Sequence, residues 1–248
     1  MLPTFVINLE RDIPKRIRME AQLKEYPELH VEFIKGVEGS TLSEAEKAAV
    51  STTHFRTQIQ FTPAALGCSL SHISIYRKIE KRSIPYALIL EDDAILSKQI
   101  DVIKDLVPLL QTDCPIVILL TPCFRYKKQQ YQTMGNDIKL CFKVRDAMMT
   151  SGYLINNSAA TLLVKRLIPV NYLADEWGTF RKMGVNLYGI VPHVISFPNN
   201  LGTIGNAFKD KIKRNPLLFL RILAGKCKAK LYLVFYMLTN YEESKKLW

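Results

Sequence analysis

Short apolar runs alternate with amphipathic segments along most of the chain. The apolar runs have the length and composition of buried strands, and the amphipathic segments repeat with the period of a helix. Strands are predicted over residues 4–9, 30–35, 86–90, 115–120 and 152–156, and helices over residues 11–26, 43–51, 67–82, 99–110 and 158–167. Because strands and helices alternate, the pattern predicts an α/β fold with a mainly parallel, Rossmann-type sheet covered by helices.

The apolar run 86–90 leads directly into three carboxylates, Glu91, Asp92 and Asp93. Ligands of open α/β sheets bind outside the carboxyl ends of the strands, and hard cations prefer carboxylate oxygens together with the phosphates of a substrate. Side chains alternate along a strand, so Glu91 and Asp93 are expected on one side and Asp92 on the other. The pattern predicts a site for Mn²⁺ or Mg²⁺, and a solvated acidic turn is the alternative.

Length and composition are those of a globular enzyme. The chain has 248 residues, of which 48% are hydrophobic, which is enough for one large α/β domain with a core of its own. No secretory leader is recognised at the N-terminus, so a cytoplasmic protein is expected. The five cysteines form no CxxC pair and are expected to be buried thiols.

The net charge of +11 is concentrated near the C-terminus, where residues 206–248 carry ten basic and three acidic side chains. Two apolar stretches in this segment are interrupted by lysine and arginine, so neither reaches the roughly 20 residues of a membrane span. A basic amphipathic helical segment of this kind is predicted to bind an anionic membrane surface. The alternative is a pair of helices packed on the enzyme or on a second subunit in a homodimer. Nucleic acid is not an expected partner, because no nucleic-acid-binding motif accompanies the charge.

Four ordered segments resemble glycosyltransferase family 25. These are Phe5-Val-Ile-Asn-Leu with Arg11 and Arg16, Gly67-Cys-Ser-Leu-Ser-His72, Leu90-Glu-Asp-Asp93 and Ser151-Gly-Tyr-Leu-Ile155. The resemblance covers about residues 3–205. It implies a GT-A-like nucleotide-binding domain over residues 1–205, followed by the basic segment 206–248.

The resemblance also implies an activity. The expected enzyme is an inverting glycosyltransferase that moves a hexose, usually galactose, from a UDP-sugar with the help of Mn²⁺ or Mg²⁺. The expected acceptor is an oligosaccharide, such as growing lipooligosaccharide at the inner face of the cytoplasmic membrane. The chain departs from the family pattern at Ala64-Ala65, where Gly-Glu is usual, and at Asn171, where an Asp is expected. A degenerate sugar-nucleotide-binding scaffold, or another metal-dependent enzyme that handles nucleotides, is therefore the alternative function.

Candidate donor-binding residues come from three of these segments. Arginine forks pair well with phosphate oxygens, and amides at a helix start favour anionic groups. The donor-binding candidates are Asn8, Arg11, Arg16, Ser71, His72, Glu91 and Asp92.

Metal and catalytic candidates complete the predicted site. Asp93 is the predicted metal ligand, and His193 is a second candidate because a late histidine can complete such a shell. Inversion requires a carboxylate base, and Asp175 and Glu176 are the candidates, with no ranking between them. The neighbouring Trp177 is expected to offer its ring to a sugar, while a helix N-cap at Asp175 is the structural alternative.

Overall fold

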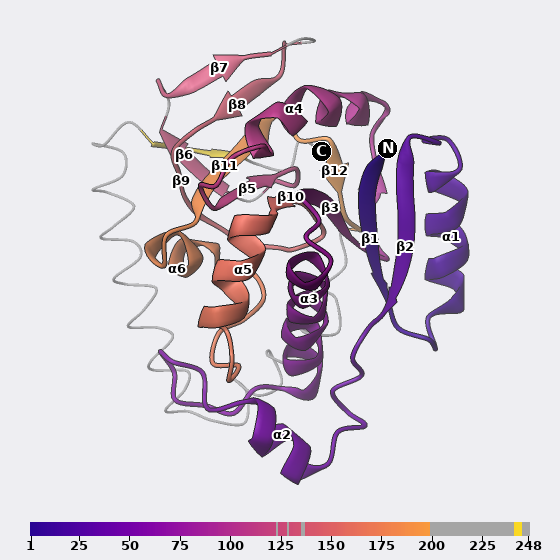
Figure 1. The fold of residues 1–248 in the computed structure, drawn as a ribbon, viewed down its shortest axis with the longest axis vertical. Coiled ribbons are helices and arrows are strands. Elements are labelled where there is room, and N and C mark those ends of the chain that lie inside the picture. The colour runs from indigo at the N-terminus through magenta and orange to yellow at the C-terminus, as the bar shows by residue number, and fades with distance from the viewer. Residues whose placement is uncertain (123, 128, 135–136, 199–240, 245–248) are drawn as a thin grey trace.

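The computed structural model describes residues 1–248 except 123, 128, 135–136, 199–240 and 245–248. A large sheet forms its centre, with helices on both faces (Figure 1). The predicted α/β class is confirmed.

The central sheet has eight strands in the order β2-β1-β3-β10-β5-β11-β8-β7. Their bounds are β1 Leu2–Asn8, β2 Leu29–Lys35, β3 Tyr86–Glu91, β5 Ile116–Leu119, β7 Tyr131–Thr133, β8 Lys139–Cys141, β10 Gly152–Asn156 and β11 Asn186–Val191. β1 is parallel to β2 and β3, and β11 is parallel to β5, whereas β10 and β8 run against their neighbours. The sheet is therefore mixed, with a parallel part at the β2-β1-β3 side.

The antiparallel strand β10 determines which loops meet at the sheet edge. Gly152 is paired with Leu90 and Asn156 with Tyr86, so β10 begins where β3 ends. The residues that precede Gly152 consequently lie beside the residues that follow Leu90. If β10 were parallel to β3, the residues that follow β10 would lie beside the end of β3 instead.

Helices cover both faces of the sheet and enclose two hydrophobic cores. The helices are α1 Ile13–Leu23, α2 Glu44–Val50, α3 Pro63–Lys81, the 3-10 helix η1 Lys98–Val102, α4 Ile103–Leu110, α5 Asn157–Arg166 and α6 Trp177–Lys182. Ile89 faces one core, together with residues of α3, α5 and α6. Leu88 and Leu90 face the other, together with residues of α1 and α4. This alternation is that of a strand buried on both faces.

Two of the helix starts follow from local sequence. Ser43 and Glu46 form the capping box expected at α2. The hydroxyl oxygen of Thr62 accepts a hydrogen bond from Ala65, and Pro63 occupies the first turn, so α3 begins four residues before the predicted Gly67. The early start places Ala64-Ala65 inside the helix.

Asn156 joins three segments of the structure. Its side-chain oxygen accepts hydrogen bonds from the amides of Ile116 and Ala159, and its amide group donates to the carbonyls of Leu110, Thr112 and Cys114. The end of α4, the start of β5 and the start of α5 are thereby held by one buried side chain.

Most of the predicted basic C-terminal segment lies outside the described residues. Its described part, Tyr241–Ser244, forms strand β13, which pairs with β6 Phe124–Lys127 in a three-stranded sheet that also contains β9 Val144–Ala147. For these four residues the predicted helix is wrong. Among the described helices, none is long and apolar enough to cross a membrane. The domain boundary near residue 205 and the membrane-binding role stay predictions.

The described cysteines are free thiols, but they are not uniformly buried. Cys141 is buried, Cys68 is half-buried and Cys114 is exposed. The expectation of buried thiols is therefore wrong for Cys114, which lies in the turn before β5. Cys123 and Cys227 lie outside the described residues.

Candidate functional site

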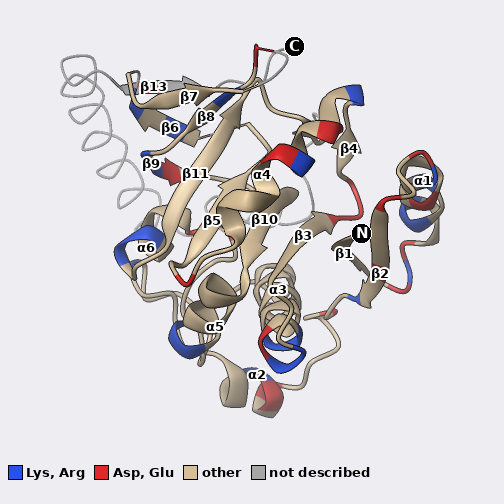
Figure 2. Ribbon diagram, turned by 45° about the horizontal axis from the view of Figure 1, so that its top comes forward, with Lys and Arg blue, Asp and Glu red and all other residues tan. Residues whose placement is uncertain are grey.

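The three consecutive carboxylates lie at the carboxyl end of β3, as predicted (Figure 2). β3 ends at Glu91, and Asp92 and Asp93 belong to a turn closed by a hydrogen bond from Ala94 N to Glu91 O. Glu91 faces helix α3, and Asp92 faces helix α1 on the opposite side. Alternation along the strand therefore places Glu91 and Asp92 on opposite sides. Asp93 lies in the turn after the strand, so the alternation does not determine the side on which it lies.

Glu91 is held by donors from two elements. His72 Nε2 lies 3.3 Å from its Oε1, the hydroxyl of Thr150 donates to the same oxygen, and the Ser151 hydroxyl donates to Oε2 over 3.4 Å. Burial alone would raise the pKa of Glu91, but the hydrogen bonds and the charge of His72 outweigh it and lower the pKa. Glu91 is therefore a carboxylate fixed in place, and Thr150 and Ser151 reach it because β10 is antiparallel.

His72 is buried and bonded through both ring nitrogens. Its Nδ1 lies 2.8 Å from the hydroxyl of Tyr153, which lies 2.8 Å from the hydroxyl of Tyr76. A continuous chain of polar groups thus runs from Tyr76 through Tyr153 and His72 to Glu91. His72 reaches the predicted site through Glu91 and does not face solvent.

Asp92 joins the acidic turn to β1 and α1. Its Oδ2 accepts a hydrogen bond of 2.8 Å from Asn8, and its Oδ1 accepts one of 3.1 Å from Lys15. Arg18 donates to the backbone carbonyl of Asp92 over 3.4 Å. Partial burial lowers the pKa of Lys15, but the charge of Asp92 and its hydrogen bond raise this pKa by more. The pKa of Lys15 is therefore above its ordinary value. The structure therefore brings the predicted binding residues Asn8 and Asp92 together, because their side chains form a hydrogen bond with each other.

Asp93 has the environment expected of a cation ligand. Burial and the charge of Glu91 raise its pKa to about 6, although Lys15 and Arg18 act in the opposite direction. Its Oδ1 is buried, and no hydrogen-bond donor among the described residues reaches it. A buried oxygen without a donor, beside two further carboxylates, is stabilised by a bound cation. Asp93 therefore fits the predicted Mn²⁺ or Mg²⁺.

Asp175 is a half-buried carboxylate whose charge interacts with that of Glu91. Burial raises its pKa, with Glu176 and Glu91 adding to the effect, while a hydrogen bond of 3.2 Å from Met149 N to its Oδ2 opposes it. The helix α6 begins after Glu176, so Asp175 is not its N-cap. A raised pKa and mutual electrostatic influence with Glu91 suit a group that takes up a proton.

Trp177 does not offer its ring to a sugar. It is fully buried, its Nε1 donates to Met149 O over 2.8 Å, and its ring packs edge-on against Tyr153. The expected sugar platform is therefore wrong. Trp177 instead anchors residue 149, whose amide holds Asp175.

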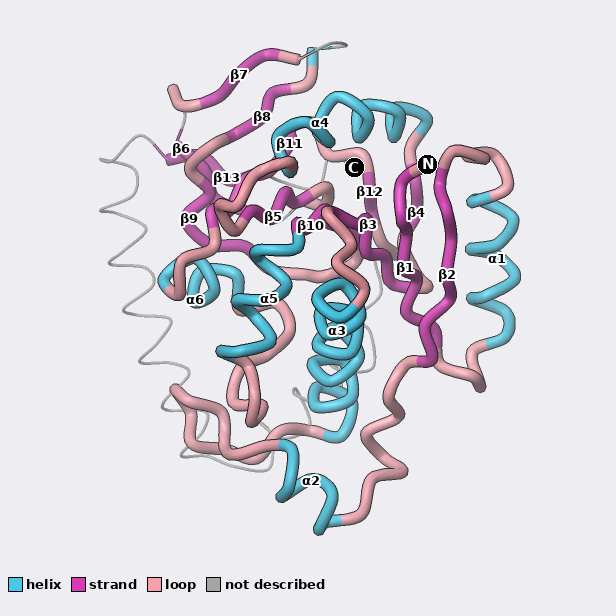
Figure 3. Tube along the Cα trace, in the orientation of Figure 1, coloured by secondary structure: helices cyan, strands magenta, loops and turns pink. Residues whose placement is uncertain are grey.

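Glu176 is engaged in a different cluster. His54 Nε2 lies 3.2 Å from its Oε1, and Arg56 Nη2 lies 3.3 Å from its Oε2. Both partners belong to the connection between α2 and α3, drawn as a loop in Figure 3. Of the two predicted bases, the geometry therefore favours Asp175, because the Glu176 carboxylate is occupied by two basic partners.

Three predicted donor-binding residues do not reach the acidic turn through any described contact. Arg11 pairs with Glu38, and Arg16 pairs with Glu20 and lies 4.4 Å over the ring of Phe33. The buried Ser71 hydroxyl accepts a hydrogen bond from Val37 N and donates to Gly67 O. These contacts position the chain, and their binding roles stay predictions.

His193 lies away from Asp93. β12 Ile195–Ser196 pairs antiparallel with β4 Ile95–Leu96, so His193 extends past Leu96, on the side opposite to Asp93. There it lines a cavity of about 350 Å³ with Ser97 and Gln99. The structure therefore does not join the two predicted metal ligands.

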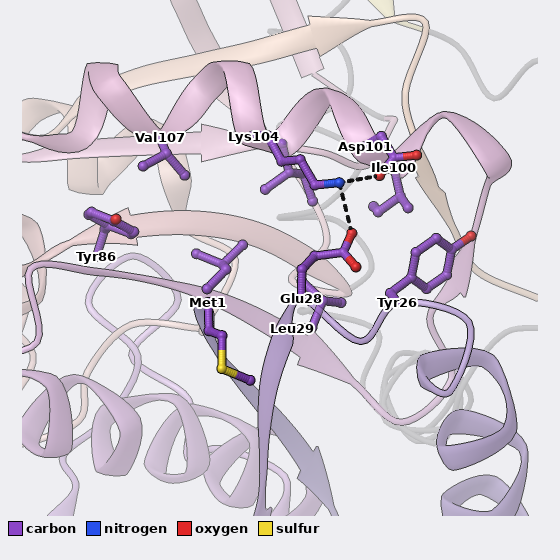
Figure 4. A pocket seen from close by; sticks show the side chains of 11 residues that line it. Met1, Tyr26, Glu28, Leu29, Tyr86, Ile100, Asp101, Lys104 and Val107 are labelled. Carbon is purple, nitrogen blue, oxygen red and sulfur yellow. Dashed lines mark hydrogen bonds and ion pairs between the residues drawn. The ribbon is translucent and has the colours of Figure 1, made fainter.

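Another cavity, of about 330 Å³, opens at the amino ends of the parallel strands (Figure 4). It is lined by Leu2, Leu29 and Tyr86, which begin β1, β2 and β3, and by apolar side chains of η1 and α4. Lys104 crosses it to Glu28 over 3.2 Å. Because this cavity lies at the amino ends of the strands, it is separate from the acidic turn.

Sequence reasoning missed Lys15, Arg18, Thr150 and Ser151. Lys15 and Arg18 share one face of α1 with Gln22, whose side chain binds the backbone of Ala94 and Leu96. That spacing of three and four residues could have identified the helix face beside the acidic turn. Thr150 and Ser151 depend on the direction of β10, which the sequence pattern does not reveal.

Comparison with known proteins identifies the family of this chain. The sequence model described as glycosyltransferase family 25 (LPS biosynthesis protein) matches residues 1–177. Procollagen galactosyltransferase 2 of Homo sapiens and that of Mus musculus are each 30% identical over 101 residues, which are 38% of this chain and 16% of the relative. The chain thus matches only a small part of these longer relatives. Because the family match covers well over half of the sequence and contains the acidic turn, the chain belongs to glycosyltransferase family 25.

Proposed function

We propose that this chain is an inverting hexosyltransferase that moves galactose from UDP-galactose to a saccharide acceptor. The observation that carries the proposal is Asp93, a half-buried carboxylate that follows the carboxyl end of β3 and has a buried oxygen that no donor in the described part of the chain reaches. Family membership and a relative named as a galactosyltransferase support the reaction and the sugar. A sheet that collects ligands at this edge is also what a GT-A-like fold requires.

Asp93 is the residue that would hold Mn²⁺ or Mg²⁺ in this proposal. The ion would supply positive charge that neutralises the diphosphate of the leaving UDP. Glu91 keeps its negative charge because His72, Thr150 and Ser151 stabilise it, and this charge adds to the attraction for a dication. Lys15 lies across the turn, where its ammonium bonds Asp92 and keeps that carboxylate away from the ion.

Asp175 is the proposed base. The acceptor hydroxyl oxygen attacks the anomeric carbon from the face opposite to UDP, the bond from that carbon to the UDP oxygen breaks, and the hydroxyl proton passes to Asp175. Met149 N donates to Oδ2 of Asp175 and holds the carboxylate in place. Burial raises the pKa of this carboxyl, so it binds the transferred proton more strongly than an exposed aspartate would.

Growing lipooligosaccharide at the inner face of the cytoplasmic membrane is the proposed acceptor. The family description, which names lipopolysaccharide biosynthesis, supports this choice. The basic segment 206–248 would hold the enzyme at the anionic surface where such an acceptor lies. Co-sedimentation with anionic liposomes tests this part, because a chain that ends at residue 205 should bind them less than the full chain.

The donor reaction is tested by UDP release from UDP-galactose with Mn²⁺ present and with EDTA. We expect UDP release only with the metal, and a rate of release at least about 100-fold lower in the Asp93→Asn variant. EDTA removes the ion and the substitution removes its ligand, so each abolishes the neutralisation of the diphosphate charge. Lys104→Met, at the separate cavity, is the control and should keep full activity. UDP binding that is equally tight in EDTA, without any turnover, would indicate a sugar-nucleotide-binding scaffold instead.

The base is tested by comparing Asp175→Asn with Glu176→Gln. The first should reduce transfer by about 100-fold or more while UDP affinity stays within a factor of about three, because only proton transfer is lost. The second should retain most of the activity. Equal losses in both variants would contradict the assignment of Asp175.

A further inference from the structure

A group of possible metal ligands lies beside the acidic turn but does not include Asp93. Sγ of Cys68, a ring nitrogen of His72 and a carboxylate oxygen of Glu91 all lie within 4.8 Å of one another. Cys68 and His72 are four residues apart on α3, so they share one face of that helix, and Glu91 ends β3 opposite them. Two secondary-structure elements thus deliver a sulfur, a nitrogen and an oxygen to one point.

We propose that Cys68, His72 and Glu91 form a binding site for a soft divalent cation such as Zn²⁺, separate from the hard-cation ligand Asp93. This inference does not rest on the proposed transfer reaction, because the cluster is defined by its ligand atoms alone. Thiolate sulfur and imidazole nitrogen favour Zn²⁺ or Co²⁺ over Mg²⁺ and Mn²⁺.

The spacing of the ligand atoms is close to that of a zinc site. With Zn–S near 2.3 Å and Zn–N and Zn–O near 2.0–2.1 Å, neighbouring ligands of a tetrahedral site lie about 3.3–3.6 Å apart. His72 Nε2 and Glu91 Oε1 are already 3.3 Å apart. The Cys68 sulfur lies within 4.8 Å of the other ligand atoms, so a movement of about 1 Å brings it to this spacing.

The surroundings of His72 allow it to become a metal ligand while its Nδ1 keeps a hydrogen-bond partner, and the cation then replaces the contact between Nε2 and Glu91. In a metal-binding histidine, the nitrogen away from the metal donates its proton to a fixed partner. Here Nδ1 faces the Tyr153 hydroxyl at 2.8 Å, and Tyr153 in turn faces the Tyr76 hydroxyl. Because either hydroxyl can donate, the chain can reverse its direction: Nδ1–H then donates to Tyr153, and the Nε2 lone pair is free for the cation.

The remaining groups complete the site. Cys68 is only half-buried, and Glu91 keeps a quarter of its side-chain surface exposed, so a cation can enter from solvent. The thiol proton is released to solvent when the sulfur–metal bond forms. Thr150 donates to the same oxygen of Glu91 that faces His72 and limits the movement of that carboxylate. Three protein ligands leave a fourth position open to water.

Direct cation binding to the full-length, metal-free protein tests the proposal. Zn²⁺ affinity is measured by competition with a chromophoric chelator, and Co²⁺ is added separately to record thiolate-to-cobalt charge-transfer absorption. We expect one tight site per chain and a sulfur-dependent Co²⁺ spectrum. Cys68→Ser should abolish the charge-transfer band and weaken Zn²⁺ binding by more than the roughly 10–100-fold that the loss of an outer partner costs.

Matched variants distinguish this site from cation binding elsewhere on the protein. Cys114→Ser removes an exposed thiol on another loop and should leave both signals unchanged. Asp93→Asn should leave Zn²⁺ affinity within about threefold, whereas Tyr153→Phe, which removes the partner of Nδ1, should weaken it by roughly tenfold. Circular dichroism confirms that each variant is folded, and Cys68→Ala gives a second test of the sulfur.

Two results would overturn the proposal. One is a Co²⁺ spectrum without thiolate absorption in the wild-type protein. The other is Zn²⁺ binding that survives Cys68→Ser and disappears with Cys114→Ser or Asp93→Asn. Since neither measurement uses a sugar nucleotide, a failure here is distinguishable from a failure of the proposed transferase reaction.

Discussion

Gly39 and Gly67 meet backbone to backbone. A Cβ atom on Gly67 would lie 2.3 Å from Val37 O and 2.8 Å from Gly39 N, and one on Gly39 would lie 1.9 Å from Pro63 O. Ser71 strengthens the same contact by accepting the Val37 amide. The glycine beside Cys68 in the family-like segment is therefore required for close packing of helix α3 on the loop after β2.

Gly67→Ala should destabilise the protein by about 2 kcal/mol or more, because the added methyl group meets rigid backbone that cannot rotate away. Gly36→Ala is the control, since its nearest neighbour is the flexible end of Leu9 at 3.1 Å. Urea unfolding of the two variants measures the difference. Similar stabilities in both would contradict the contact.

Asp93→Asn should change the pH dependence of stability when metal is removed by a chelator. In the folded protein the pKa of Asp93 is about 6, above its ordinary value of 3.8, so the folded state binds this proton more strongly than the unfolded state. Wild-type stability due to this group is present below pH 4 and is lost as the pH rises toward 6. The variant, which is neutral throughout, should match the wild type near pH 4 and exceed it by about 1–2 kcal/mol at pH 7. A difference that does not vary with pH would refute the raised pKa.

Lys15→Met should destabilise the protein by about 1 kcal/mol, since it leaves the buried Asp92 carboxylate with one partner fewer. Arg16→Met, on the same helix, removes a more exposed ion pair with Glu20 and should cost less than about 0.5 kcal/mol. A double-mutant cycle of Lys15→Met with Asp92→Asn isolates the pair. A coupling energy of zero would show that the contact contributes nothing.

Glu176→Ala should loosen the loop over residues 52–61, because the carboxylate joins that loop to α6 through His54 and Arg56. Losing these bonds costs about 1–2 kcal/mol locally, which corresponds to roughly 5–30-fold faster amide hydrogen exchange. The amides of His54 and Gln58 report it, since both bond within the loop. Glu44→Ala, which removes an exposed pair with Lys47, should leave these rates unchanged. Unchanged exchange in Glu176→Ala would mean that the backbone bonds of the loop suffice.

Much of the fold follows from local patterns, and one long-range feature does not. The apolar run 86–90 and the capping box at Ser43 each specify their element with neighbouring residues only. The direction of β10 depends on its partners β3 and β5, because a strand buried on both faces reads the same in either direction. Thr150 and Ser151 could therefore not be assigned to Glu91 beforehand.

The part of the candidate site that could be predicted is the part whose residues are neighbours in the sequence. The position of Glu91, Asp92 and Asp93 at the end of a strand needed only the strand itself. The distinction between Asp175 and Glu176 needed the loop that carries His54, which is more than a hundred residues away in sequence. Trp177 was misjudged because an aromatic ring next to carboxylates has the same sequence pattern whether it is exposed or in the core.

The amide side chain of Asn156 has a consequence for how this protein can change over evolution. Because it satisfies the carbonyls of Leu110, Thr112 and Cys114, the turn between α4 and β5 needs little help from its own side chains, of which Thr112 accepts a hydrogen bond from Cys114 N. The side chains of residues 111, 113 and 114 are thus free to vary, and the exposed Cys114 is one of them. Position 156 itself can change little, because few other side chains both donate and accept hydrogen bonds in this geometry.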